Sequence, residues 1–557
     1  MSSGISRRTV LRTIGIGTAL AATGVSLSAC STSEGGNTLS NEGKKLAPWP
    51  DYIPHPDAPQ PDLAPNDKGV QPGYAAYPKE LKQSVAEKPG DGSKVTVWTI
   101  TWGAPPKAKE KHQLWQALNK QLGVDLDLVV VPAMEAQQKF ATLVAGGELP
   151  DILAVSQYLP NPTELIAAKC QDLTEFLSGD AVKEYPNLAA IPTYAWKAAG
   201  RIDGRLYRFP VERSRIGHSL SANQERLKEA GIWVPEIGGI AVDDFTKGLQ
   251  QLSGRKKWGM GVAGLGAFGF NSVVPMFGAP NQWALKDGQF TSYIDSDGFK
   301  AGLEQLAKWQ KAGVFRADPL SHDATLGTDF QTGITAAVSR SNIDFTGNAI
   351  AIKDGFTLET VRPLKPTNGA NPGHWFSPGA DYFTALKKAP KERIRLLLRV
   401  MDFLAAPFGT KEWELVNYGV EGTHFTRGDD GSPVQTKLAL DGDNKDTLGI
   451  SFIATGQQVL FLPAGVPGGA ESVERRHAFQ TEVAEIGVVD PSVGLLSKTW
   501  YAKQNELMLL KEDAIKAIVM GRKPLSSWDS MVKDWKAKGG DRAAEEFAKE
   551  YAAAAKA

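Results

Sequence analysis

Apolar and polar residues recur along the chain in two alternating patterns, one typical of buried strands and the other of helices. In the first such region the expected elements are a strand at 95–100, a helix at 107–123, a strand at 124–132, a helix at 134–147 and a strand at 151–156. Strands that alternate with helices are typical of a parallel sheet with helices on both faces. This part of the sequence therefore predicts an α/β domain.

The alternation continues toward the C-terminus. Further strands are expected within 258–264, 333–341 and 378–389, and further helices at 241–254, 296–313 and 391–407. From residue 474 onward the pattern is mainly helical. We predict an α/β protein built on mostly parallel sheets flanked by helices, and the length of 557 residues indicates more than one domain.

Residues 30–93 differ from the rest because they are small, polar and then dense in proline. Proline fixes φ and removes a backbone donor, so this segment favours extended polyproline structure over helix or central strand. We interpret it as a proline-rich tether. Its aromatic residues leave a second possibility open, namely that they hold parts of the segment on the folded body; they are Trp49, Tyr52, Tyr74 and Tyr77.

The first 30 residues carry an export pattern. Residues 6–12 (SRRTVLR) resemble a twin-arginine signal, and the apolar run 13–29 is too short and too rich in glycine and alanine to span a membrane. Residues 27–30 (LSAC) resemble the lipobox of bacterial lipoproteins, which implies cleavage after Ala29 and acylation, including palmitate, of Cys30. An ordinary cleaved signal followed by a chance cysteine is the alternative. The lipoprotein interpretation predicts a protein anchored to the outer face of the cell membrane through two or three acyl chains.

Charge and cysteine content narrow the possible partners. Removal of residues 1–29 takes away three arginines and no acidic residue, which leaves 59 basic and 62 acidic residues, a net charge of −3. This balance favours neither nucleic acid nor an anionic membrane surface as a partner. With Cys30 acylated, Cys170 is the remaining cysteine, and its apolar helical context predicts a buried, inert thiol.

Motifs for catalysis are absent from the sequence. It contains no HExxH, GxSxG or CxxC, and its seven histidines do not have the spacing of metal ligands. A glycoside hydrolase needs only two suitably placed carboxylates, so a surface enzyme acting on polysaccharide stays an alternative. We expect no catalytic residues, no cofactor and no metal site.

Five segments, in order, resemble the carbohydrate-binding, family 1 solute-binding proteins of ABC importers, above all the long branch that includes alginate-oligosaccharide binders. These segments are LVAGGELPDILAV (143–155), GRIDGRLYRFP (200–210), SANQERLKEAGI (221–232), NYGVEGTHFT (417–426) and the C-terminal helices (521–551). Many members of that branch carry a calcium loop after the helix at 241–254. Here that place reads LSGRKKWGMG, which predicts no structural calcium.

The resemblance implies a type II periplasmic-binding-protein-like fold of two lobes with a ligand cleft between them. By the family's pattern, lobe one would comprise 94–212 and 334–384, and lobe two would comprise 213–333 and 385–557. The implied function is hinge closure on a carbohydrate and its delivery, by a monomer, to an ABC permease in the membrane. A binder of a non-sugar solute such as a peptide is the remaining alternative.

Sugars present flat C–H faces with a rim of hydroxyls, so a binding cleft needs aromatic faces and fixed polar groups. On that basis, and from the resemblance, the expected ligand-binding residues are Trp102, Gln157, Tyr158, Glu212, Arg213, Trp283, Trp375, Glu421 and His424. Trp283 and Trp375 are expected in loops. For Glu212 and Arg213 the alternative is a solvated ion pair at the hinge, and for Glu421 and His424 it is a structural turn. Other tryptophans at helical spacing are expected to pack in the core, namely Trp115, Trp196, Trp309, Trp413 and Trp535.

Overall fold

A computed structural model describes residues 39–156, 162–262, 269–341, 345–352 and 355–555. The signal segment 1–29, Cys30, Gln157 and Tyr158 lie outside the described residues. The described body begins at Leu39 and forms one compact unit. None of its described helices is long and apolar enough to cross a membrane.

The first sheet has five strands in the order β2-β1-β3-β12-β4. Their bounds are β1 Lys94–Thr101, β2 Asp125–Pro132, β3 Ile152–Ser156, β4 Phe209–Glu212 and β12 Ala380–Leu386. Strand β1 pairs in parallel with β2 and β3, while β12 runs antiparallel to both β3 and β4. Strand β12 thus enters the sheet from a distant part of the chain.

The second sheet has four strands in the order β10-β5-β9-β6. Their bounds are β5 His218–Asn223, β6 Trp258–Gly261, β9 Thr335–Ser341 and β10 Leu358–Val361. Only the β6–β9 pair is parallel, and β5 pairs antiparallel with β9 and β10. The α/β class and the helix-flanked sheets are as predicted, but both sheets are mixed rather than mostly parallel, because the long-range partners of β5 and β12 were invisible in the local pattern.

Helices with one apolar face cover the first sheet. They are α1 Gln113–Leu122, α2 Ala136–Gly146, α3 Pro162–Lys169, α4 Thr174–Leu177, α5 Pro186–Ala189, α6 Thr193–Ala199, α13 Lys391–Leu404 and α14 Lys411–Tyr418. Apolar residues of α1 and α13 share one core with β1 and β2. Cys170 is fully buried in a neighbouring core, as predicted, and burial raises the pKa of its thiol to about 12.

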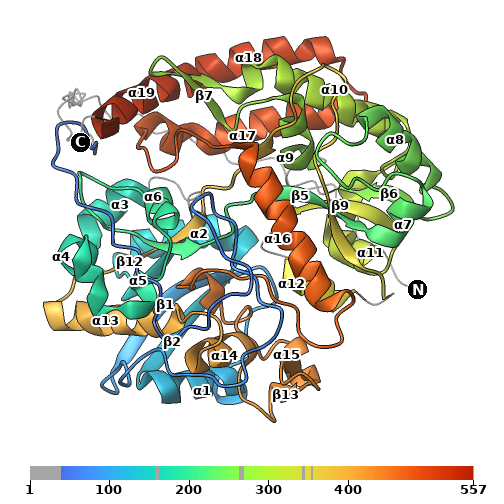
Figure 1. Cartoon of the computed structure of the whole chain (residues 1–557). Helices are drawn as coiled ribbons and strands as arrows, with labels where there is room; N and C mark the ends of the chain where they lie inside the picture. Colours follow the sequence, from blue (N-terminus) through green and yellow to red (C-terminus); the bar gives the residue numbers. More distant parts are fainter. Residues whose placement is uncertain (1–38, 157–161, 263–268, 342–344, 353–354, 556–557) are drawn as a thin grey trace, which may run out of the picture. The chain divides into compact units, whose positions relative to one another are not determined.

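A second set of helices packs on the second sheet and beyond it. These are α7 Gln224–Glu229, α8 Val242–Gln251, α9 Phe270–Val273, α10 Asp297–Lys311, α11 Leu326–Gln331, α12 Phe345–Ala351, α16 Gly469–Glu485, α17 Lys498–Val519, α18 Trp528–Trp535 and α19 Asp541–Ala555. The last three lie together against α10 and the hairpin β7 (Trp283–Lys286) and β8 (Gln289–Ser292) (Figure 1). Their apolar faces complete the largest core of the protein. Short pieces make up the rest: β11 His374–Trp375 with β15 Gly487–Val488, β13 Phe425–Arg427 with β14 Pro433–Gln435, and α15 Lys437–Leu440.

The distribution of segments between the two sheets corrects part of the expected lobe division. Strand β9, which falls within the segment 334–384 expected in lobe one, pairs with β5 and β6 in the second sheet. Helix α13, expected in lobe two, packs on the core of the first sheet. The chain passes between the sheets after Glu212 and again before Ala380, because strand pairing rather than sequence position decides which sheet each segment joins.

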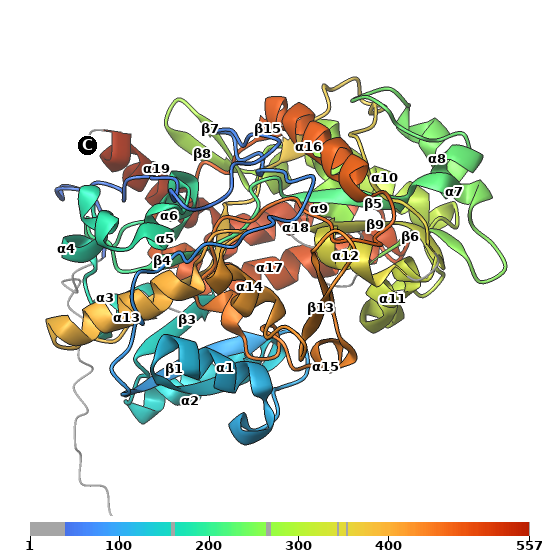
Figure 2. The same ribbon diagram turned by 60° about the horizontal axis from the view of Figure 1, so that its bottom comes forward.

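The proline-rich segment is held on the folded body from Leu39 to the start of β1 (Figure 2). Tyr74 and Tyr77 are buried in an aromatic cluster with Phe408 and Phe461. The Tyr77 hydroxyl donates a 2.7 Å hydrogen bond to Glu414. The described part of the tether, residues 39–93, is therefore ordered structure, and of the two interpretations left open the packed one holds.

Candidate functional site

A cavity of about 860 Å³ lies between residues of the first and second sheets, and we call it the interlobe cavity. Its volume falls within the range of about 300–1,000 Å³ that is typical of ligand sites. The ends of β1, β3, β4 and β12 supply one wall, while β11, the start of β7 and helix α17 supply the other. Its lining includes Trp98, Ile100, Trp102, Met134, Gln137, Arg208, Arg213, His218, Asn271, Asn281, Trp283, Tyr293, Trp375, Asp381, Tyr382, Asp490, Ser492, Trp500, Tyr501, Gln504, Asn505, Lys511 and Glu512.

On the first wall an aromatic surface faces the cavity. The side chain of Trp102 directly follows β1 and is 62% exposed. It interacts with the phenol of Tyr382, whose ring lies 4.8 Å from that of Phe452 in an edge-on arrangement. The Arg213 guanidinium lies over Phe452 and donates to the Ser451 carbonyl at 3.1 Å. These contacts fix a flat apolar face beside a cation.

The second wall is also aromatic, but its rings are tightly packed. Trp375 is nearly buried on β11, and its indole donates to the Ala279 carbonyl at 2.9 Å. Trp283 begins β7 and is wedged among Trp500, Trp535 and Phe547 at centroid distances of 5.4–5.9 Å. Both tryptophans were expected in loops, and both lie on short strands instead, because their rings are needed in the core. Trp500, which the sequence did not single out, is half-buried in the same lining.

Two acidic side chains in the cavity lining, Asp381 and Asp490, have a raised pKa. Burial raises the pKa of Asp381 above its usual value, and the charge of Arg213 opposes that rise. Burial likewise raises the pKa of Asp490 to about 6, although the backbone amide and hydroxyl of Ser492 both donate to its carboxylate. A carboxyl group with a pKa near neutrality can donate or accept a hydrogen bond according to pH.

Glu212 lies beneath the cavity rather than in its lining. It ends β4 where the chain first leaves the first sheet, and it is fully buried. The Tyr194 hydroxyl donates to one carboxylate oxygen at 2.6 Å, and the backbone N–H of Gln458 donates to the other at 2.9 Å. Burial raises the pKa of Glu212 to about 7, and these hydrogen bonds oppose the rise.

Glu421 and His424 lie apart from the described lining of the cavity. His424 is buried, accepts from the Val420 amide through Nδ1, and donates from Nε2 to Asp443 at 3.1 Å. Asp443 in turn accepts from the Gln113 and Leu114 amides at the start of α1. Glu421 is mostly exposed and forms an ion pair with Arg427. Both residues therefore make contacts that support the fold around them.

Four of the nine expected residues thus line one cavity, namely Trp102, Arg213, Trp283 and Trp375. Sequence reasoning missed Arg208, Tyr382, Asp490 and Lys511, which also line it. Arg208 precedes β4 in one of the segments that carried the family resemblance, but its ring contacts and burial depend on β12, which is distant in sequence. No local signal distinguishes such residues.

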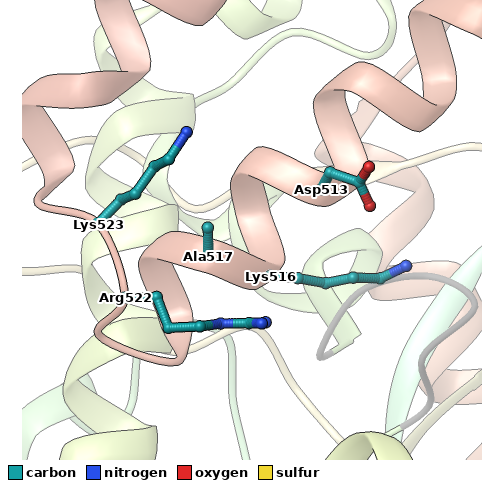
Figure 3. Close-up of a pocket in the computed structure, with 5 residues that line it drawn as sticks. All are labelled: Asp513, Lys516, Ala517, Arg522 and Lys523. Atoms are coloured by element: carbon teal, nitrogen blue, oxygen red, sulfur yellow. The ribbon is translucent and has the colours of Figure 1, made fainter.

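A second, smaller hollow of about 510 Å³ lies at the end of α17 (Figure 3). It is lined by Asp513, Lys516, Ala517, Arg522 and Lys523. The sticks in Figure 3 show mostly long charged side chains and no aromatic face. Lys516 also pairs with Glu512 on the same helix, so this surface is typical of a solvated helix end.

Comparison with known proteins places these features in a family. Residues 113–413, more than half of the chain, match the family described as bacterial extracellular solute-binding protein. The chain is 23% identical over 491 residues to the polygalacturonan/rhamnogalacturonan-binding protein YtcQ of Bacillus subtilis, covering 84% of this chain and 94% of that one. It is 21% identical over 473 residues to the lipoprotein LipO of the same species, covering 80% of this chain and 90% of LipO.

Solved structures share the fold at low sequence identity. The alginate-binding protein AlgQ2, solved without calcium ion, is 15% identical with a TM-score of 0.58, covering 84% of this chain and 99% of that chain. An HMO-binding solute-binding protein associated with an ABC transporter, from Bifidobacterium longum infantis, is 16% identical with a TM-score of 0.60, again covering 84% and 99%. These matches confirm the two-lobed α/β fold. The family match confirms the prediction of a binding protein rather than an enzyme, and the chain belongs to the bacterial extracellular solute-binding protein family.

Proposed function

We propose that this protein captures an oligosaccharide in the interlobe cavity and delivers it to an ABC importer. The observation that carries the proposal is the pairing, in one cavity, of aromatic faces with fixed polar groups from both walls. Trp102 offers an accessible ring on the first wall, and Arg213, Asp490 and Gln504 offer polar groups in the same lining. Sugar rings need this combination of a flat apolar surface and directional hydrogen bonds.

Relatives support the same ligand class. YtcQ is a polygalacturonan/rhamnogalacturonan-binding protein and AlgQ2 is an alginate-binding protein. A further structure of the same fold, the substrate-binding protein FusA of S. pneumoniae, was solved in complex with kestose and has a TM-score of 0.58 and 16% identity. Within the described lining we assign ligand contacts to Trp102, Arg213, Trp283 and Trp375. Gln157 and Tyr158, which follow the residues of β3 in the sequence, stay proposed contacts from the family resemblance.

Capture proceeds by closure of the two lobes. The chain leaves the first sheet for the second at residues 213–217 and re-enters the first sheet at residues 376–379, and these short connections are the proposed hinge. A ligand that contacts both walls stabilises the closed form, and its effect is limited to its difference in affinity for the closed and open forms. The closed monomer then docks on the permease.

Membrane attachment completes the proposal. Cleavage after Ala29 and acylation of Cys30, including palmitate, would hold the protein on the outer face of the cell membrane. The similarity to the lipoprotein LipO supports this anchoring. Export by the twin-arginine route is proposed from residues 6–12 alone. Mass spectrometry of protein from the native membrane, compared with a Cys30→Ser variant, tests the anchor: the variant should lose the acyl mass and appear in the medium.

The experiment that tests capture uses the chain from residue 31, which retains the whole described body. Its melting temperature is measured against oligosaccharides from glucan, xylan, mannan, pectin and alginate, with reducing-sugar release followed in the same samples. Binding raises the melting temperature by mass action, about 2.7 kcal/mol of stabilisation at a ligand concentration of 100 Kd. A shift without new reducing ends supports capture, whereas new reducing ends would indicate a surface enzyme.

A further inference from the structure

Arg208 is a buried cation in the wall of the interlobe cavity, at the residue directly before β4. Its side chain is only 6% exposed. Its guanidinium lies 5.1 Å from the ring centroid of Phe383 on β12, which holds the side chain in place. Its Nε is buried without a hydrogen-bond partner, and within the described part of the chain its guanidinium makes no ion pair.

Such a cation is unusual in a folded protein. Charged side chains are almost never buried unless they are paired, because the loss of hydration is costly. A guanidinium presents its donors as a rigid fork that matches the two oxygens of a carboxylate. Arg208 has no such partner within the described residues, so a carboxylate on a ligand in the cavity could supply it.

A second cation in the same lining points the same way. Lys511 on α17 is 8% exposed and donates a 2.8 Å hydrogen bond to the hydroxyl of Tyr293. Its ammonium also lies 5.2 Å from the ring centroid of Phe270. These partners are neutral, and within the described residues Lys511 makes no ion pair with a carboxylate.

The acidic groups of the lining differ in their partners. Glu512 pairs with Lys516 and Asp381 interacts with the charge of Arg213, whereas Asp490 accepts two hydrogen bonds from the neutral Ser492. Two cations, Arg208 and Lys511, and one carboxyl group, Asp490, thus lack an oppositely charged partner within the described lining, which leaves an excess of positive charge. Arg208 belongs to the first wall and Lys511 to the second, so an anionic ligand could engage both.

We infer that the ligand is an acidic oligosaccharide, with a uronate carboxylate bound by Arg208 and a further carboxylate near Lys511. This inference rests on the proposed function and specifies its substrate class. Carboxylates on a sugar chain would supply the anionic partners that Arg208 and Lys511 lack among the described residues. Closure would then bring the two cations onto one ligand, which increases the difference in affinity between the closed and open forms.

The test compares matched ligands, an oligogalacturonate and its carboxyl-reduced neutral homologue of the same length and linkage. Isothermal titration calorimetry at pH 7 should show at least ten-fold tighter binding of the uronate. Arg208→Met should reduce uronate affinity by at least ten-fold and leave affinity for the neutral homologue within three-fold. Raising the salt concentration should weaken uronate binding alone, since salt screens charge–charge attraction.

Control variants separate charge recognition from loss of structure. Arg201 stacks at 3.6 Å on Trp49 and also has a buried Nε without a partner, but it lies outside the cavity lining, so Arg201→Met should leave both affinities unchanged. Arg208→Met should melt at or above the wild-type temperature without ligand, because it removes an uncompensated charge. Arg208→Lys should restore part of the uronate preference.

Two results would overturn the inference, and they differ in what else they overturn. Equal binding of the uronate and its neutral homologue, with Arg208→Met affecting both alike, would mean that Arg208 binds hydroxyl groups. Oligosaccharide capture would then still stand. Failure of every oligosaccharide in the wider set to bind would overturn the proposed function and this inference together.

Discussion

The hydroxyl of Tyr194 donates a 2.6 Å hydrogen bond to the buried carboxylate of Glu212 at the point where the chain leaves the first sheet. Helix α6 is thereby joined to the end of β4, and the backbone N–H of Gln458 connects a third segment to the same carboxylate. The connection after Glu212 is a proposed hinge. The buried Glu212 carboxylate therefore holds the chain in place on the first-sheet side of that hinge.

The pH dependence of this contact can be predicted. Burial raises the pKa of Glu212 to about 7 from an ordinary value of 4.5, so the unfolded chain releases the proton first as pH rises. The contribution of Glu212 to stability therefore decreases between about pH 4.5 and pH 7. Above pH 7 the Tyr194 hydroxyl donates to a charged acceptor, and such hydrogen bonds are stronger.

Tyr194→Phe should lower the free energy of unfolding by about 1 kcal/mol at pH 5 and by about 2–3 kcal/mol at pH 8. Urea denaturation at both pH values measures the difference. Tyr185→Phe is the matched control, because the Tyr185 hydroxyl is buried without a hydrogen-bond partner among the described residues, and its removal should be neutral at both pH values. An equal loss at pH 5 and pH 8 for Tyr194→Phe would contradict the raised pKa.

The packed proline-rich segment should contribute to global stability. Tyr77→Ala removes a ring in contact with Phe408 and Phe461, and should lower the free energy of unfolding by about 3–5 kcal/mol. Tyr52→Ala, at a 43% exposed ring in the same segment, should cost under about 1 kcal/mol. Similar small effects of both variants in urea denaturation would mean that the segment is a free tether in solution.

His424 should matter for stability and not for ligand affinity. His424→Ala leaves the Val420 amide and one oxygen of Asp443 without their partner, and should cost about 2–3 kcal/mol of stability. Glu421→Ala removes only an exposed ion pair with Arg427 and should cost under about 1 kcal/mol. A loss of oligosaccharide affinity in folded His424→Ala would return His424 to the binding site.

Trp102 should matter for affinity and not for stability. Its ring is 62% exposed, so Trp102→Ala should change the free energy of unfolding by under about 1 kcal/mol. The loss of a stacking face should weaken oligosaccharide binding at least ten-fold, about 1.4 kcal/mol. Leu440→Ala, with a 63% exposed side chain outside the cavity lining, is the control. Calorimetry measures the free energy of unfolding and the oligosaccharide affinity of both variants. Unchanged affinity in Trp102→Ala would remove this ring from the site.

Local patterns predicted the elements well and their partners poorly. The apolar run at the start of the body became β1, and the strongly apolar segment after residue 390 became α13. The pairing of β9 with β5 was not predictable, because it joins strands more than 100 residues apart and leaves no local trace. Together with the pairing of β10 and β5, it moves part of the segment expected in lobe one to the second sheet.

Site residues could be predicted when their residue type alone suggests sugar binding, as for tryptophan. They were missed when their role depends on burial and on partners distant in the sequence. Trp102 follows a strand and lies exposed at the cavity, as a binding tryptophan should. Trp283 and Trp375 line the same cavity, but from strands packed into the core. Arg208 carries no motif, since its significance arises from a ring on β12 and from the lack of a paired carboxylate within the described residues.

The most direct test of the central claim is calorimetric titration of the chain from residue 31 with oligosaccharides, with small-angle X-ray scattering of the same samples. We predict saturable binding of one oligosaccharide class, no release of new reducing ends, and a smaller radius of gyration in the bound state as the lobes close. Saturable binding of a non-sugar solute with no response to any oligosaccharide would contradict carbohydrate capture. Binding with an unchanged radius of gyration would contradict closure.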